Sequence, residues 1–151
     1  MSQTNAAART GAPPQPGRLA RLRMSSFGLV MMLILEFVLG IIYNLYGTAP
    51  TAHKSVGLFS SPDLALHVIL GILLVVAAVM QLIRAVGTRH RLAMALSAVG
   101  LIAIIGAGSS GLGFAGNGDS GSSLGMALLF AVALASYAVL VLVLPGRDSA
   151  T

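Results

Sequence analysis

The sequence predicts an all-α fold, a polytopic membrane four-helix bundle with both termini cytoplasmic. Four long apolar runs, separated by short polar breaks, fill most of the chain between residues 25 and 144. Each run can cross a hydrocarbon core as a helix, which takes about 20 predominantly apolar residues. The composition agrees, because 56% of the residues are hydrophobic, 9% are charged and the mean hydropathy is +0.92. A soluble domain rarely has this balance, so we expect one membrane domain at 24–145.

The first span is predicted at 25–46, after a basic segment at 1–23. Its first 17 residues or so combine Ala, Thr, Gln, Pro and Gly with no apolar periodicity, so we expect a disordered cytoplasmic tail. Ser25 and Ser26 are candidate caps for the start of the helix, and Gly47 is expected to end it.

The second span is predicted at 62–84, because Ser60-Ser61-Pro62-Asp63 has the cap, the proline and the acidic residue typical of a helix start. The connection after it is short, so the third span, 92–114, is expected to lie antiparallel beside the second. The glycine-rich end of the third span is a candidate for local unwinding, which lipid tolerates where protein or water satisfies the backbone. The fourth span, 122–144, leaves a short cytoplasmic tail at 146–151.

The basic residues are distributed unevenly between the connections. Arginines precede the first span, occupy the connection at 85–91 and follow the fourth span, whereas Lys54 alone lies in the first connection. The positive-inside bias therefore predicts a cell-membrane protein with 47–61 and about 115–121 outside. Nucleic acid is not expected as a partner, because the chain has no folded basic domain with interleaved aromatic residues.

Small residues form stripes at helical spacing on several spans. In lipid such residues mark close helix packing, because they let two backbones approach. We expect packing inside the bundle, and the stripe on the fourth span is alternatively a surface for a homodimer or for another membrane protein. The residues are Gly40 and Gly71 on the first two spans, Gly100, Ala103 and Ala107 on the third, and Ala127, Ala131 and Ala135 on the fourth.

Glu36 is the only acidic residue deep within a span, about 11 residues from its start. An ionised carboxylate at that depth costs several kcal/mol, so Glu36 is a candidate for function. His67 in the second span lies nearer the outer surface, at a vertical offset from Glu36 on the order of 8 Å. We therefore expect a cluster of Tyr43, Asn44 and His67 rather than a Glu36–His67 pair. The candidate binding or proton site comprises Glu36, Tyr43, Asn44, His67 and Gln81.

No catalytic or metal-binding motif is evident. The run from Gly113 to Gly121 lacks the Lys-Ser/Thr of a phosphate loop, and it holds one carboxylate where calcium loops use several. The chain has no cysteine, which excludes disulfides and thiolate ligands. The first hypothesis is thus a small accessory or scaffold protein rather than an enzyme, with the lipid bilayer as a partner and no cofactor.

Two alternatives come from other functional classes. Four spans with one membrane-embedded glutamate, Glu36, resemble the small multidrug resistance exporters, which implies proton-coupled transport of a small molecule. His67, with Gly108-Ser109-Ser110-Gly111 and Gly118-Asp119-Ser120-Gly121, is similar to a half of the haem A synthases. That resemblance implies a haem- or quinone-associated protein, in which only a homodimer contributes two axial imidazoles.

The layout as a whole resembles uncharacterised four-span membrane proteins of high-GC Gram-positive bacteria. The resemblance depends on Glu-Phe-x-x-Gly-x-x-x-Asn-Leu-Tyr from Glu36 to Tyr46 and on Leu-His-x-x-x-Gly from Leu66 to Gly71. It covers most of residues 25–144 and implies no known activity.

Overall fold

The structure is a computed structural model that describes residues 16–47, 50–51 and 54–146. It consists of four helices, and the described residues contain no strand beyond one isolated bridge between Thr51 and Lys54. The helices are α1 (Pro16–Tyr46), α2 (Pro62–Thr88), α3 (Arg91–Asn117) and α4 (Ser120–Val143). Each described helix is long and apolar enough to cross a membrane. The predicted all-α four-helix membrane bundle is therefore confirmed.

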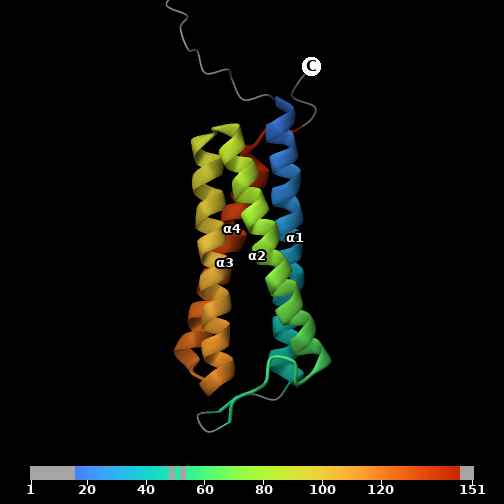
Figure 1. Cartoon of the computed structure of the whole chain (residues 1–151), viewed down its shortest axis with the longest axis vertical. Helices are drawn as coiled ribbons and strands as arrows, with labels where there is room; N and C mark the ends of the chain where they lie inside the picture. The colour runs from blue at the N-terminus through green and yellow to red at the C-terminus, as the bar shows by residue number, and fades with distance from the viewer. Residues whose placement is uncertain (1–15, 48–49, 52–53, 147–151) are drawn as a thin grey trace, which may run out of the picture.

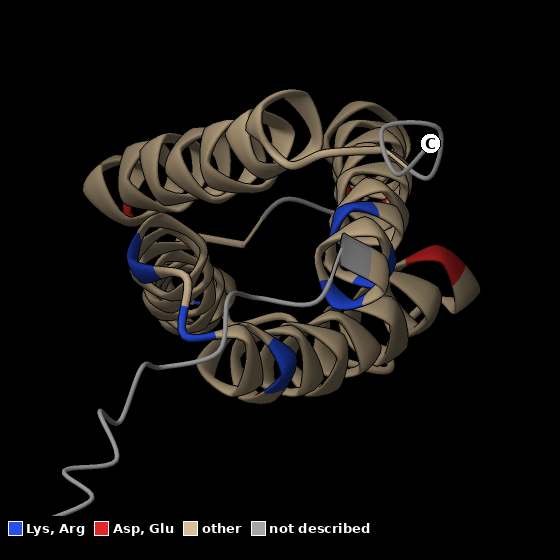
Figure 2. Cartoon of the chain, turned by 90° about the horizontal axis from the view of Figure 1, so that it is seen from above, with Lys and Arg blue, Asp and Glu red and all other residues tan. Residues whose placement is uncertain are grey.

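The helices run alternately up and down along one long axis (Figure 1). The start of α1, the α2–α3 turn and the end of α4 lie at one end, which we call the basic end. Seen from there, arginines surround the helix ends (Figure 2). The opposite end, with the α1–α2 and α3–α4 connections, is the loop end. The described arginines of the basic end are Arg18, Arg21, Arg23, Arg84, Arg89 and Arg91.

The first helix begins at Pro16, well before the predicted start at Ser25. Leu19 and Leu22 are buried against the core, so the apolar periodicity of α1 extends back into the basic segment. The proposed serine cap is consequently wrong: Ser26 lies inside the helix and its hydroxyl donates to the Leu22 carbonyl at 3.0 Å. The predicted disordered tail at 1–23 is thus helical from residue 16. Its residues 1–15, like residues 147–151 of the predicted tail at 146–151, lie outside the described residues.

Side chains cap the starts of the other three helices. The Ser61 hydroxyl accepts a hydrogen bond from the Leu64 N–H at the start of α2, as the sequence predicts. His90 Nδ1 accepts from the Ala93 N–H to begin α3, and Asp119 accepts from the Ser122 N–H to begin α4. The glycine-rich end of α3 remains helical as far as Asn117, so the expected unwinding does not occur.

The core lies in the half of the bundle nearer the basic end. Among the described helix residues on the loop-end side of Glu36, Leu74, Ala107 and Ala133, only Leu64 is buried. Figure 1 agrees, since α1 and α2 together diverge from α3 and α4 toward the loop end. The bundle is thus tightly packed in one half and more open in the other.

The predicted packing stripes fall on different faces. Gly100, Ala103 and Ala107 are buried on α3, where a Cβ at Gly100 would meet the ring of Tyr137. The stripe on α4 is instead exposed, because the larger Tyr137 and Leu140 face the core and turn the alanines outward. These exposed residues are Ala127, Ala131 and Ala135. The expectation that they pack inside the bundle is corrected accordingly.

Candidate functional site

Glu36 of α1 and His67 of α2 meet inside the bundle. Nδ1 of His67 lies 3.2 Å from Oε1 of Glu36, and the side chains are 26% and 10% exposed, respectively. The expectation that an axial offset keeps them apart is therefore wrong. The two side chains reach across the axial offset because a glycine opposite each of them leaves space for it.

Two glycines make room for this contact. A Cβ built at Gly40 would lie 3.5 Å from Cε1 of His67, and one built at Gly71 would lie 3.1 Å from Oε1 of Glu36. Each polar side chain therefore faces the glycine that lies four residues beyond its partner. The arrangement is reciprocal, with Glu36-x-x-x-Gly40 of α1 against His67-x-x-x-Gly71 of α2. The side chains of Glu36 and His67 therefore reach each other across an axial separation of about one helical turn.

The pair retains unused hydrogen-bonding capacity. The approach of Nδ1 to Oε1 is within ion-pair distance but lacks the angles of a hydrogen bond, so Nδ1 of His67 is buried without a hydrogen-bond partner. Oε2 of Glu36 is buried without one as well. Such groups are costly away from water unless a proton, a ligand or a water engages them. The arrangement is therefore suited to exchanging a proton or a small polar ligand.

The pair lies at the edge of the packed half of the bundle. Leu29 and Leu33 are buried on the basic side of Glu36, while no described α1 residue beyond Glu36 is buried. Phe37 stacks on Phe130 of α4, with ring centroids 5.6 Å apart and an interplanar angle of 26°. This contact joins α1 to α4 beside the pair, which therefore borders the more open, loop-end half.

The other predicted site residues lie on either side of the pair along the bundle. Asn44 is exposed and Tyr43 is partly buried, about one turn beyond Gly40, which faces His67, toward the loop end. Gln81 lies in the other direction, where its Nε2 donates to Ser26 Oγ at 2.6 Å and to the Leu22 carbonyl at 3.2 Å. Of the five predicted residues, Glu36 and His67 are in direct polar contact.

Gln81 belongs to a second polar group that the sequence analysis missed, which we call the polar layer. Each helix contributes one buried polar side chain to it: Ser26, Gln81, Ser97 and Tyr137. Gln81 and Ser97 lie about two turns from the α2–α3 connection, and the Tyr137 ring lies against Gly100, one turn from Ser97. Oε1 of Gln81, Oγ of Ser97 and Oη of Tyr137 are buried without hydrogen-bond partners. A polar residue near the basic end of each apolar span was the available signal.

Candidate metal ligands are sparse in the part of the chain that the structure describes. It brings together no group of three or more His, Cys, Asp or Glu residues. His67 offers one imidazole, whose Nδ1 faces Glu36.

Fold and composition together define the class: a multi-pass integral membrane protein with four helices. Comparison of the chain with protein-family models, with curated proteins and with solved structures gives no match.

Proposed function

We propose that this membrane protein binds a proton at the Glu36–His67 pair and that the proton controls ligand binding between α1 and α2. The observation that supports the proposal is the 3.2 Å approach of the one carboxyl group deep in a span to an imidazole of the neighbouring span. In this role the protein is a small accessory or binding protein rather than an enzyme.

The chemistry follows from the cost of charge in the membrane interior. An uncompensated carboxylate there costs several kcal/mol, and a protonated imidazole beside Glu36 offsets much of that cost. Uptake of one more proton from water makes the pair cationic, and loss of one makes it anionic. Either change alters which ligand charge the site accepts, so ligand and proton binding are coupled.

A second candidate is proton-coupled transport of a small molecule, favoured by the unequal packing of the two halves. Alternating access requires a site with a packed barrier on one side and access on the other. Here buried residues lie on the basic side of Glu36, and Leu64 is the single buried helix residue described beyond the pair on the other. With the basic end in the cytoplasm, as the positive-inside bias favours, the more open half beyond the pair faces the outside of the cell membrane.

Infrared difference spectroscopy between acidic and neutral buffers tests the proton site without a ligand. The purified protein should show a carboxyl band from a protonated acid in apolar surroundings. Glu36→Gln should abolish that band, and His67→Gln should shift the pH at which it appears. The matched controls Asp63→Asn and Asp119→Asn, at the helix starts, should leave it unchanged. A band that persists in Glu36→Gln would contradict the proposal.

Transport is tested separately in proteoliposomes with an imposed pH gradient and a lipophilic organic cation as the probe. Gradient-driven movement of the probe that Glu36→Gln abolishes would support the second candidate. An intact infrared band without probe movement would favour the accessory role.

A further inference from the structure

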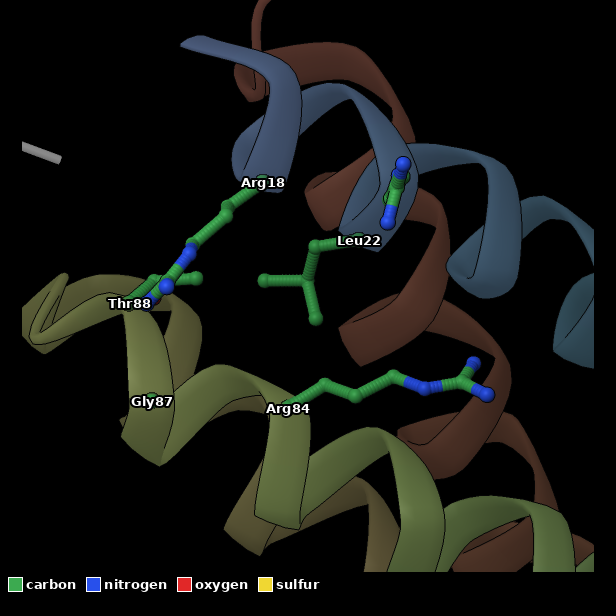
Figure 3. A pocket seen from close by; sticks show the side chains of 6 residues that line it. Arg18, Leu22, Arg84, Gly87 and Thr88 are labelled. Carbon is green, nitrogen blue, oxygen red and sulfur yellow. The ribbon is translucent and has the colours of Figure 1, made fainter. Parts of the chain in front are cut away.

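A cavity at the basic end lies between α1 and α2, away from the Glu36–His67 pair. Its volume is about 500 Å³. Figure 3 shows side chains from both helices facing this space. The residues that line it are Arg18, Arg21, Leu22, Arg84, Gly87 and Thr88.

The cavity is cationic, and no described carboxylate balances it. Three of its lining residues are arginines, and none is acidic. Among the described residues, the acidic side chains are Glu36 in the middle of α1 and Asp63 and Asp119 at the loop end. Three guanidinium groups without a counter-charge at a membrane surface favour an anionic ligand.

The donors of the cavity remain available to a ligand. Arg18 points from α1 toward Thr88 of α2, and Arg84 extends beneath Leu22 (Figure 3). Nη1 of Arg84 donates to Ser25 Oγ at 2.9 Å, which leaves most of its five N–H groups free. The Thr88 hydroxyl is already committed to the Ala85 carbonyl at 2.7 Å, so the arginines are the binding groups.

The backbone adds to this preference for an anion. The first N–H groups of α1, next to Arg18, have no acceptor within the helix and lie at the positive end of its dipole. A side chain at Gly87 would meet nothing within 4 Å, so this wall of the cavity is open. A tetrahedral phosphate accepts forked guanidinium donors, and the cavity offers one from each helix, Arg18 of α1 and Arg84 of α2.

We infer that this cavity binds a phosphate group, and that the phosphate is the headgroup of an anionic phospholipid. The location favours a lipid over a soluble phosphate, because the cavity lies at the ends of spanning helices. Exposed apolar side chains of α1 and α2, Met24, Phe27 and Ile83, begin within about two turns of it. A phospholipid therefore matches both features: its phosphate suits the cationic cavity, and its acyl chains suit the exposed apolar side chains beside it.

Native mass spectrometry of the full chain, released from detergent with added lipid, tests the inference. Phosphatidylglycerol should be retained more strongly than phosphatidylcholine of the same acyl composition. The double variant Arg18→Gln/Arg84→Gln should lower phosphatidylglycerol retention about tenfold. Arg89→Gln/Arg91→Gln is the matched control pair, because it removes two charges from the same end but none from the cavity.

The outcomes separate the sources of the phosphate. Retention that survives millimolar inorganic phosphate but is lost in the double variant supports the lipid. Displacement of the lipid by inorganic phosphate, with direct phosphate binding that the double variant abolishes, would overturn the lipid assignment in favour of a soluble ligand. Equal losses in the control pair and the double variant would overturn the cavity, since attraction would then depend only on total charge. Equal retention of phosphatidylcholine would overturn the anionic preference.

Discussion

At the residue scale, the Glu36–His67 contact depends on two absent side chains. Gly71 is the tighter position, because a Cβ there would lie 3.1 Å from the Glu36 carboxylate. At Gly40 the nearest atom of His67 would lie 3.5 Å away, an ordinary contact distance. The two glycines therefore allow a matched comparison. Replacement by alanine affects the helix at both positions, but it crowds the site only at Gly71.

We expect Gly40→Ala and Gly71→Ala to differ in their effects. Gly40→Ala should stabilise the protein by about 0.5–1 kcal/mol, since alanine favours the helix and fits the space. Gly71→Ala should displace the carboxyl group and shift the infrared band of Glu36. Unfolding in a denaturing detergent gives the free energies. Identical spectra in the two variants would show that Gly71 does not position Glu36.

The polar layer supports a prediction about the Tyr137 hydroxyl, one of its two unpartnered hydroxyls. Oη of Tyr137 is buried without a hydrogen-bond partner, so Tyr137→Phe removes a polar atom that makes no stabilising hydrogen bond in the folded protein. We expect unfolding free energy to stay the same or to rise by about 1 kcal/mol. Gln81→Leu, which loses the bonds to Ser26 and Leu22, should instead lower it by about 1–2 kcal/mol. A large loss in Tyr137→Phe would mean that water fills the layer.

Individual residues were only partly predictable from the sequence. Glu36 and His67 are identifiable because charged or ionisable groups are rare in apolar spans. Their contact was not, because it depends on the register between α1 and α2 and on the space at Gly40 and Gly71. Neither the register between two helices nor the space at a glycine can be predicted from hydropathy or from residue spacing within one helix.

At the element scale, boundaries follow local chemistry where a cap is available. Ser61 begins α2 as predicted, whereas α1 extends back to Pro16 because Leu19 and Leu22 reach the core. Burial of these two leucines in the core thus determined where α1 begins, rather than the capping tendency of Ser25 and Ser26. The faces of α4 were mispredicted for a related reason: small residues mark close approach, but the helix buried its larger Tyr137 and Leu140.

The start of α4 should be sensitive to acid. The Ser122 N–H donates to the Asp119 carboxylate at 2.7 Å, and this bond holds the pKa of Asp119 below its usual value. The stabilisation is complete above the unfolded-state pKa and is lost as the pH falls through the lower folded-state pKa. Asp119→Ala should therefore speed hydrogen exchange in the first turn of α4 at neutral pH. At a pH below both values, the difference from the wild type should vanish.

The exposed alanine stripe of α4 predicts a self-association surface. Because the chain has no native cysteine, Ala131→Cys introduces a single thiol. We expect it to form a disulfide-linked dimer in oxidised membranes, while Ile72→Cys, exposed on α2, should remain monomeric. No dimer, or equal dimer in both variants, would leave the stripe facing lipid.

At the scale of the whole molecule, the number and order of the helices were predictable and the distribution of packing was not. Four apolar runs and a short α2–α3 connection predict the bundle and the antiparallel neighbours. Every span is predominantly apolar in both of its halves, because lipid and protein core favour the same side chains. Hydropathy therefore contains no signal for the difference between the packed half and the open half.

This difference in packing predicts a difference in access from water. Ser110 lies in the loop-end half of α3 and is partly buried, whereas Ser97 is fully buried in the polar layer. In the cysteine-free background, Ser110→Cys should react with a membrane-impermeant maleimide far faster than Ser97→Cys, because burial excludes the reagent from the packed half. The side of addition reports orientation: with the basic end in the cytoplasm, Ser110→Cys reacts from outside and Arg91→Cys only after the membrane is opened. Equal rates at Ser110 and Ser97 would remove the packing argument for transport, while leaving the Glu36–His67 contact intact.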